Sequence, residues 1–246
     1  MTDVNPALIA ELEKISEPGA LLAELDRRFG RRMAIATSGQ LTDTAIVALA
    51  ASAGAKPRVY TADTLRLFPE TYAHFQEVEA RYGIAIERLA PDRAELENMV
   101  TEQGEYLFFD SKEKQEFCCA VRKVHANDRM LDQLDCWVTG LRAAQSAGRA
   151  GLPRIEIFRH RDRDILKVQP LVDWSEDKLR AYMNDNAVPM HALMKDPLPG
   201  GWSYESLGCV ICTTPIGPYE PRRAGRWRWF NQDANKECGL HLPRAT

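Results

Sequence analysis

Apolar positions along the chain follow two spacings, continuous short runs and the three-to-four-residue repeat of a helix face. Short apolar runs that end at turn residues predict strands within 31–39, 56–64, 84–92, 136–142 and 155–171. Helical spacing predicts helices in the first thirty residues and over 41–54, 68–83, 92–104 and 175–186. Strands that alternate with helices indicate an α/β fold whose sheet is mainly parallel and flanked by helices.

Three turns that follow predicted strands are expected to form the functional site. Ligands of such sheets bind beyond the carboxyl ends of the strands, which places residues 37–43, 63–66 and 139–145 there. Ser38 and Asp63 lie in the first two of these turns and are candidates for binding a substrate. For Ser38 and Asp43 the alternative is a simple cap on the helix that follows.

Composition narrows the class of protein. The chain has 246 residues, of which 45% are apolar and 27% charged, and its formal net charge is −3. These values fit one large domain, or a domain with a small appendage, and provide no overall attraction to nucleic acid or an anionic membrane. We find no segment typical of a membrane span or a secretory signal, so we expect a cytoplasmic protein.

Four of the six cysteines form two close pairs. Cys118 and Cys119 are adjacent, whereas Cys209 and Cys212 have the C-x-x-C spacing that lets two thiolates converge on one metal centre. Adjacent side chains on a helix point about 100° apart, so the first pair suits two corners of a bulky cluster better than one small ion. We predict a four-thiolate [4Fe–4S] cluster, with zinc or buried apolar cysteines as the alternatives. Cys136, in an apolar strand, is expected to be core.

The C-terminal part of the chain has a different character. Regular spacing fades from about residue 190, so we expect an α/β domain over 1–217, which binds the nucleotide and the cluster, and a mobile catalytic tail over 218–246. The tail contains Cys238 and, three residues later, His241. Arginines at 222, 223, 226 and 228, interleaved with tryptophan, precede them. Such a run can bind nucleic acid or be a solvated surface, but the net charge and the nearby thiol favour anion binding. Cations also lower the pKa of a thiol from its usual value of about 8.5.

Seven motifs together resemble those of the assimilatory adenylyl-sulfate reductases, the iron–sulfur branch of the phosphoadenylyl-sulfate reductase family. The motifs are DTLRLFPETY, CCAVRK, WVTGLRAAQS, LKVQPLVDWSEDKLRAYM, SLGCVICTTP, RRAGRW and KECGLH. The resemblance extends from about residue 31 to residue 241. The two cysteine pairs mark the cluster-containing members, whereas cluster-free members act on the 3′-phosphorylated substrate and keep the terminal ECGLH.

This resemblance implies an adenine nucleotide α-hydrolase-like (PP-loop) fold and the reduction of adenosine 5′-phosphosulfate to sulfite and AMP, in sulfate assimilation for cysteine biosynthesis. Cys238 would attack the substrate's sulfur to form a cysteine S-sulfonate, which thioredoxin or a glutaredoxin-like donor would then reduce. The cluster of the family is not a redox group and serves structure and local electrostatics. The side chains expected to bind substrate are Lys123, Arg142, Arg223, Arg226 and His241, besides Ser38 and Asp63. No nucleic-acid or membrane partner is expected, and the sequence leaves homo-oligomerisation open.

Three stretches depart from the family pattern on the nucleotide side. The phosphate loop, usually close to S-x-G-x-E-D, reads SGQLTD, with Gln40 in place of a glycine and Thr42 in place of an acid. Leu65 replaces the glycine of DTGR, and Ala143 and Ala144 replace the Arg-Asp of GLRRDQS. The alternatives are therefore a 3′-phosphoadenylyl-sulfate reductase or an iron–sulfur or zinc protein whose catalysis has drifted. An ATP pyrophosphatase is disfavoured because the loop lacks the acidic position of SGGxDS.

Overall fold

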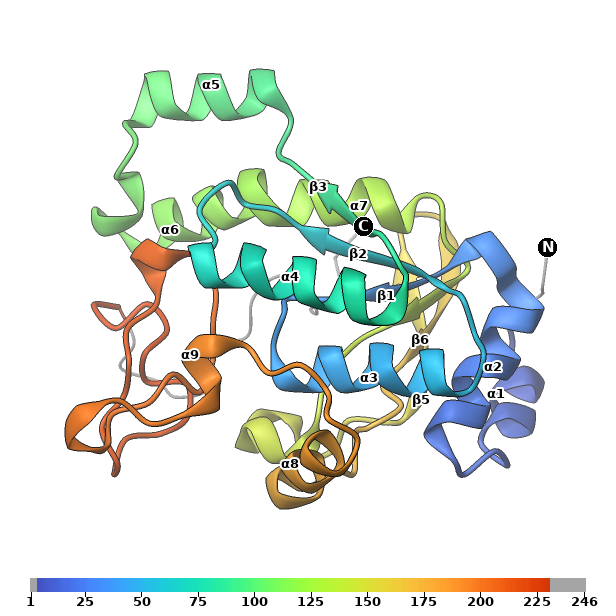
Figure 1. Ribbon diagram of the computed structural model, residues 1–246. Coiled ribbons are helices and arrows are strands. Elements are labelled where there is room, and N and C mark those ends of the chain that lie inside the picture. Colours follow the sequence, from blue (N-terminus) through green and yellow to red (C-terminus); the bar gives the residue numbers. More distant parts are fainter. Residues whose placement is uncertain (1–3, 231–246) are drawn as a thin grey trace.

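A six-stranded sheet forms the centre of the molecule in the computed structural model, which describes residues 4–230 (Figure 1). Its strands are β1 Met33–Ala36, β2 Arg58–Ala62, β3 Ile86–Leu89, β4 Cys136–Val138, β5 Ile155–His160 and β6 Arg163–Val168. They lie in the order β3-β2-β1-β4-β6-β5. Neighbouring strands are parallel except β5 and β6, which form an antiparallel hairpin at one edge. The expected α/β fold with a mainly parallel sheet is confirmed.

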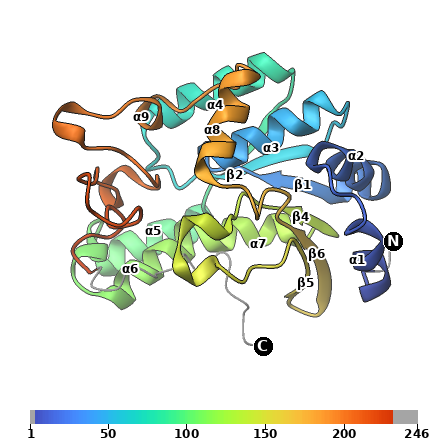
Figure 2. The same cartoon turned by 90° about the horizontal axis from the view of Figure 1, so that it is seen from below.

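Helices cover both faces of this sheet. They are α1 Pro6–Leu12, α2 Pro18–Phe29, α3 Leu41–Ser52, α4 Pro69–Tyr82, α5 Arg93–Gln103, α6 Lys112–Cys119, α7 His125–Leu131, α8 Glu176–Asp185 and α9 Ala192–Lys195. A π-helical stretch, Ala120–Val124, joins α6 to α7. Figure 2 shows α3, α4 and α8 on one side of the sheet and α5, α6 and α7 on the other.

Alternating side chains of the central strand β1 belong to two hydrophobic cores. Met33 and Ile35 pack in the core that contains residues of α2, α3 and α8, whereas Ala34 packs in the other with Tyr60 of β2 and Trp137 of β4. Successive strand side chains point to opposite faces, so a strand covered on both faces must be apolar at every position. This explains why the sequence of β1 is a continuous apolar run rather than an alternating one.

Local signals set the helix boundaries. Helix α4 begins at Pro69, whose fixed φ suits the first turn, and ends before Gly83, which has a φ of +63°. Helix α8 begins after Ser175, whose Oγ accepts a hydrogen bond from the backbone N of Lys178 at 3.1 Å. Both helices lie within the predicted ranges 68–83 and 175–186. Strand β4 is shorter than predicted, because the chain leaves the sheet after Val138.

The segment after α9 is irregular, as its composition predicts. It contains short 3₁₀ turns at Pro199–Gly201 and Val210–Cys212 and an isolated bridge between Thr213 and Arg226. The backbone N of Trp227 donates to Cys212 O at 3.1 Å, so this part of the expected tail packs against the cysteine segment. Residues 231–246 lie outside the described part of the chain, and the division at residue 217 stays a prediction. Between residues 4 and 230, no helix has the length and apolarity that a membrane span requires.

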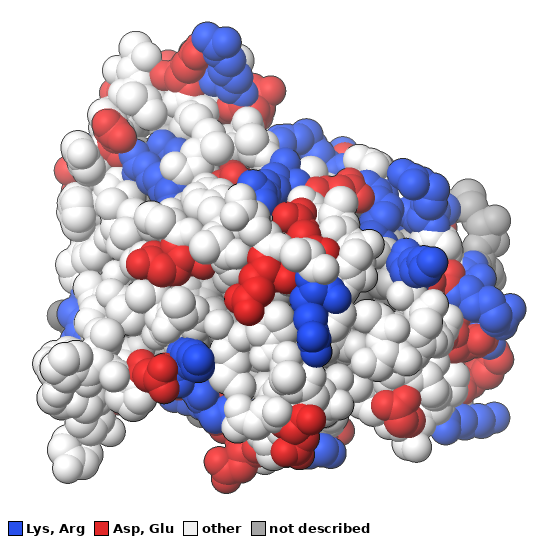
Figure 3. Space-filling view, in the orientation of Figure 1, with Lys and Arg blue, Asp and Glu red and all other residues white. Residues whose placement is uncertain are grey.

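Charged side chains of both signs are interspersed over the face drawn in Figure 3. Lysine and arginine lie beside aspartate and glutamate, with no broad field of one sign on this face. Such mixing agrees with the small formal net charge of −3. It gives this face no electrostatic footprint for a polyanion such as nucleic acid.

Candidate active site

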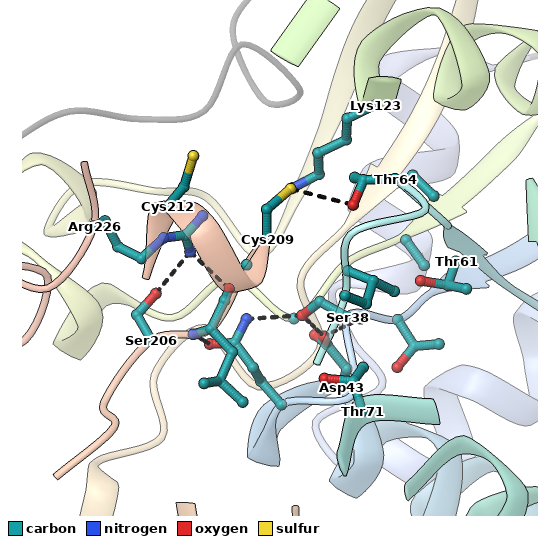
Figure 4. A pocket seen from close by; sticks show the side chains of 18 of the residues that line it. Ser38, Asp43, Thr61, Thr64, Thr71, Lys123, Ser206, Cys209, Cys212 and Arg226 are labelled. Carbon is teal, nitrogen blue, oxygen red and sulfur yellow. Dashed lines mark hydrogen bonds between the residues drawn. The ribbon is translucent and has the colours of Figure 1, made fainter. Parts of the chain in front are cut away.

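The turns after β1, β2 and β4 line one cavity at the carboxyl edge of the sheet (Figure 4). This is the expected location of a ligand site in a mainly parallel sheet. The segment 205–227 and the stretch that joins α6 to α7 complete its walls. Its cationic lining residues are Arg66, Arg122, Lys123, Arg142, Arg149, Arg222, Arg223 and Arg226. Uncharged polar and aromatic residues also line it, among them Tyr60, Thr61, Asn127, Trp137 and Thr139.

The carboxylate of Asp43 holds the turn after β1 in shape. Asp43 Oδ2 accepts hydrogen bonds from the backbone N and the Oγ of Ser38, at 2.7 and 2.6 Å. Gly140, after β4, leaves the space that this carboxylate occupies, since a Cβ there would lie 1.8 Å from Asp43 Oδ1. Burial raises the pKa of Asp43, and the hydrogen bonds from Ser38 oppose this shift. Ser38 therefore lines the cavity as predicted, but its hydroxyl already donates a hydrogen bond to Asp43 within the loop.

Two of the positions that depart from the family loop bond to distant segments. Gln40 Oε1 accepts a hydrogen bond from the backbone N of Leu207 at 3.1 Å. Thr42 Oγ1 accepts one from Arg142 Nε at 3.0 Å. The other nitrogens of this buried guanidinium donate to Trp174 O at 2.8 Å and to Glu176 Oε2 at 2.5 Å. Arg142 thus joins the cavity wall to α3 and α8, and its predicted contact with substrate stays a prediction.

Among the predicted substrate-binding residues that the structure describes, Asp63 is the one that does not line the cavity. Its Oδ1 accepts hydrogen bonds from the backbone N of Leu65 at 2.9 Å and from the hydroxyl of Tyr72 at 2.7 Å. Its neighbours Ala62 and Thr64 do line the cavity. Leu65, where the family has glycine, has a φ of +59°, in the left-handed region that favours glycine. In this structure Asp63 stabilises that turn, and its predicted contact with substrate stays a prediction.

The four paired cysteines all line the same cavity. Gln115 Nε2 donates to Cys119 Sγ at 3.2 Å, and Cys209 Sγ donates to Thr64 Oγ1 at 3.2 Å. Burial, together with the nearby thiols of Cys209 and Cys118, raises the pKa of Cys212 to about 12. The two pairs, about ninety residues apart in the sequence, are therefore close enough to interact.

The described cysteines are not arranged around a single ion. Across residues 4–230, no three side chains of the Cys, His, Asp and Glu types are grouped so that they could hold one metal ion. Two buried guanidinium nitrogens, Arg66 Nη1 and Arg122 Nε, have no hydrogen-bond partner among the described residues. Both arginines act on the pKa of Cys118, lowering it against the larger raising effect of burial. Positive charge is thus directed at the place where thiolates would gather.

Predicted substrate-binding cations lie around the remainder of the cavity. Lys123 points into it in Figure 4, from the π-helical stretch directly after the first cysteine pair. Arg226 is 9% exposed, and its Nη1 donates to Ser206 Oγ at 3.1 Å and to Leu207 O at 2.7 Å. Arg223 also lines the cavity. Cys238 and His241, which we expect to react with and to bind the substrate, lie outside the described residues.

Sequence reasoning missed several residues of this site. Arg149 is buried and lines the cavity in a stretch that has no recognisable motif. Gln115, on the helix turn before the cysteine pair, had no signal beyond its four-residue distance from Cys119. Asn127 is 2% exposed and accepts a hydrogen bond from the hydroxyl of Tyr60 at 2.7 Å, while its Nδ2 has no partner in the described part of the chain. An unpartnered buried amide in a cavity wall is a candidate ligand contact.

The chain is similar to one known family and to several named proteins. Residues 32–215 match the family described as the phosphoadenosine phosphosulfate reductase domain. The chain is 38% identical over 241 residues to the adenosine 5′-phosphosulfate reductase of Sinorhizobium fredii strain NGR234, which covers 97% of this chain and 91% of that protein. It is 41% identical over 184 residues to the enzyme of the same name from Allochromatium vinosum, covering 75% and 68%.

Two solved structures have a similar fold. One is the phosphoadenylyl-sulfate reductase of Candida auris in a phosphate complex, with a TM-score of 0.66 and 23% identity over 87% of this chain and 99% of that chain. The other is the FMN adenylyltransferase of Candida glabrata with FMN and an ATP analogue, with a TM-score of 0.54 and 17% identity over 87% and 69%. At these identities the similarity establishes the fold alone, which is of the PP-loop type.

Proposed function

The chain belongs to the phosphoadenosine phosphosulfate reductase domain family, and we propose on this basis that it reduces adenosine 5′-phosphosulfate to sulfite and AMP in assimilatory sulfate reduction. Relatives that are 38% and 41% identical carry the name of that activity. The observation that supports the proposal most directly is the meeting of both cysteine pairs with several cations in one cavity at the carboxyl edge of the sheet.

The charge distribution within the cavity supports an orientation for the substrate. Phosphosulfate is an anion whose oxygens suit guanidinium and ammonium groups, so we assign it to Lys123, Arg223 and Arg226, with Arg149 as an addition from the structure. The nucleoside carries no charge and suits the uncharged lining, where Asn127 offers a hydrogen-bond donor. This division brings the reacting sulfur to the same end of the cavity as the arginines.

We assign Cys118, Cys119, Cys209 and Cys212 as the ligands of a [4Fe–4S] cluster. Four thiolates on such a cluster leave a net negative charge, and the unpartnered nitrogens of Arg66 and Arg122 suit that charge. When bound, the cluster supplies a structural cross-link and a fixed charge beside the substrate anion. Gln115 and Thr64 would orient the cysteines through the contacts already described.

The chemistry that we propose needs one free thiol. The thiolate of Cys238 attacks the sulfur of the substrate, so that an S–S bond forms, the bond from sulfur to the bridging oxygen breaks, and AMP leaves with that electron pair. The cationic side chains stabilise the charge that develops on the leaving phosphate. Cys238 is then a cysteine S-sulfonate, and His241 would help to hold its sulfonate oxygens.

A second thiol completes the reaction, and we propose thioredoxin or a glutaredoxin-like protein as its source. Its thiolate attacks the Cys238 sulfur, and sulfite leaves with the electron pair of the S–S bond. A mixed disulfide results. The second thiol of the donor then attacks the donor sulfur in this mixed disulfide. The donor is released as an intramolecular disulfide, and the Cys238 thiolate is restored. Two electrons have passed from the donor to the sulfate sulfur.

A labelling experiment tests the proposal. The full chain is purified without oxygen, its iron and sulfide are measured, and it is incubated with adenosine 5′-phosphosulfate labelled with ³⁵S and, separately, with the labelled 3′-phosphorylated form. We expect about four iron and four sulfide per chain, and label that stays on the denatured wild-type protein but not on Cys238→Ser. Cys136→Ala, which alters a buried cysteine of β4, is the matched control and should keep the label.

The outcomes separate the alternatives. Label from the 3′-phosphorylated substrate alone would replace this activity with phosphoadenylyl-sulfate reduction. Label from neither substrate, in a protein that holds its cluster, would refute the enzymatic proposal. One zinc per chain in place of iron would refute the assignment of the cluster, whatever the outcome of the labelling.

A further inference from the structure

The side chain of Gln40 connects the phosphate loop to the segment that contains the second cysteine pair. Its Oε1 accepts a hydrogen bond from Leu207 N at 3.1 Å, and its Nε2 donates to Ser38 Oγ at 2.8 Å. A backbone N–H can only donate, so the contact with Leu207 determines which end of the amide is the oxygen. Ser38 Oγ donates its own proton to Asp43 Oδ2, at 2.6 Å, and is free to accept from Gln40. The donors and acceptors along this chain of bonds are therefore all matched.

The connection continues from Leu207 to an arginine and a cysteine. Leu207 O accepts a hydrogen bond from Arg226 Nη1 at 2.7 Å, and Cys209 follows two residues later. Gly208 lets the guanidinium pack against the backbone, because a Cβ there would lie 2.2 Å from Arg226 Nη2. Figure 4 shows this segment beside Ser38 and the cavity. One amide thus links the phosphate loop to a predicted cluster ligand and to a predicted anion-binding arginine.

A second connection begins at Thr42, the other altered position of the loop. Arg142 donates to Thr42 Oγ1 at 3.0 Å and to Glu176 Oε2 at 2.5 Å. Glu176 Oε2 also pairs with Arg222 Nη1 at 3.1 Å, and the other end of Arg222 pairs with Glu205 at 2.9 Å. Both altered positions therefore connect the loop to the segment 205–226. At position 40, the glycine of the family loop has no side chain that could make this contact.

We infer that Gln40 is a positioning residue that holds the segment 205–212 and Arg226 against the phosphate loop before substrate binds. The inference rests on the proposed function, because ordering this segment in advance would strengthen the binding of an anionic nucleotide. A segment that is already ordered need not be ordered by the ligand, so more of the contact energy appears as affinity. Gln40 needs no contact with the substrate for this role. The loop lacks one glycine that would allow its backbone to approach phosphate closely. It would instead favour substrate binding by positioning the segment 205–212 and Arg226.

Two variants separate the bonds of Gln40. Gln40→Met keeps the length of the side chain and removes both hydrogen bonds, whereas Gln40→Glu keeps an acceptor for Leu207 N and loses the donor to Ser38. Gln133→Met is the matched control, since Gln133 is an exposed amide beyond α7. For each anaerobically purified full-length protein we would measure kcat and KM with adenosine 5′-phosphosulfate, the Kd of AMP, and hydrogen–deuterium exchange of Leu207 N–H.

For Gln40→Met we expect KM and the Kd of AMP to rise roughly tenfold while kcat stays within about twofold, because an interaction common to the ground state and the transition state is lost. Exchange of Leu207 N–H should be faster by a similar factor, and slow again in Gln40→Glu. Gln133→Met should match the wild type in every measurement.

Three results would each decide against one of the two proposals. Faster exchange with unchanged KM and AMP affinity would overturn the inference, since the bond would then order the segment without helping binding. Unchanged exchange in Gln40→Met would overturn it as well. A wild-type protein that binds AMP but does not turn over adenosine 5′-phosphosulfate would overturn the proposed function alone, and the AMP and exchange measurements would still decide the role of Gln40.

Discussion

Two histidines are buried side by side next to the loop 38–43, and we expect acid to destabilise the fold by protonating them. His74 of α4 and His191, which precedes α9, are 3% and 0% exposed, and their ring centres are 5.5 Å apart. His74 also lies against the loop, since a Cβ on Gly39 would be 3.4 Å from its ring. A charge on either ring would therefore lie in an apolar region next to the candidate active site.

The hydrogen bonds of His74 show that the folded protein holds it neutral. Thr44 Oγ1 donates to Gln40 O at 3.2 Å, so the hydroxyl oxygen accepts the proton of His74 Nε2, at 2.9 Å. The other nitrogen, Nδ1, is buried and has no hydrogen-bond partner among the described residues. Protonation at Nδ1 would place an N–H and a positive charge where residues 4–230 offer no acceptor.

The direction and size of the pH effect follow from the pKa. Burial, with a smaller contribution from the neighbouring His191, lowers the pKa of His74 from 6.5 to about 4. The unfolded chain therefore takes up the proton first as the pH falls, and the free energy of unfolding decreases between about pH 6.5 and pH 4. At pH 5 this difference in pKa amounts to about 2 kcal/mol relative to neutral pH. For a chain of this size, that lowers the melting temperature by about 4–8 °C.

Thermal unfolding at pH 7 and pH 5 measures the effect. His74→Gln keeps a donor for Thr44 and cannot be protonated, so the decrease in melting temperature between the two pH values should be smaller than in the wild type by about 4–8 °C. Gln133→Met, at an exposed amide that does not titrate in this range, is the control, and its decrease should equal that of the wild type. An equal decrease in all three proteins would show that protonation of His74 is not what acid destabilises.

Three further substitutions test other parts of the structure. Leu65→Gly relieves a left-handed backbone conformation that costs leucine roughly 1–2 kcal/mol, but it also gives the unfolded chain entropy worth roughly 0.4–1 kcal/mol, so the melting temperature should rise slightly. A fall of several degrees would show that the backbone of Leu65 is not strained. Gly140→Ala brings a Cβ to 1.8 Å from the Asp43 carboxylate, so it should lower the free energy of unfolding by about 1–3 kcal/mol in a urea titration and weaken AMP binding in calorimetry. Gly148→Ala is the control, since its Cβ would meet nothing within 4 Å, and it should change neither measurement. Asn127→Leu should weaken AMP binding roughly threefold to tenfold, measured by calorimetry, and an unchanged Kd would remove this amide from the site.

The turns that line the cavity could be located from the sequence, but the directions of their side chains could not. Asp63 follows a strand, as a ligand contact in this fold often does, yet its carboxylate caps the turn of Leu65 and bonds to Tyr72. The backbone conformation of that turn decides where the side chain points. Arg142 was expected at the substrate and donates from all three guanidinium nitrogens to protein atoms. Motif spacing carries no information on such competition between partners.

The sequence by itself determined the succession of strands and helices along the chain and the spacing of the two cysteine pairs. Periodic apolar positions report which face of an element is buried, and this local property survives without knowledge of the neighbours. The tertiary structure decided which distant groups meet. Gln40 and Leu207 are 167 positions apart, and Thr42 and Arg142 are 100 apart. The bonds between them depend on angstrom-scale placement by the packed sheet and helices, so the loop that departs from its family by sequence becomes interpretable only in the folded chain.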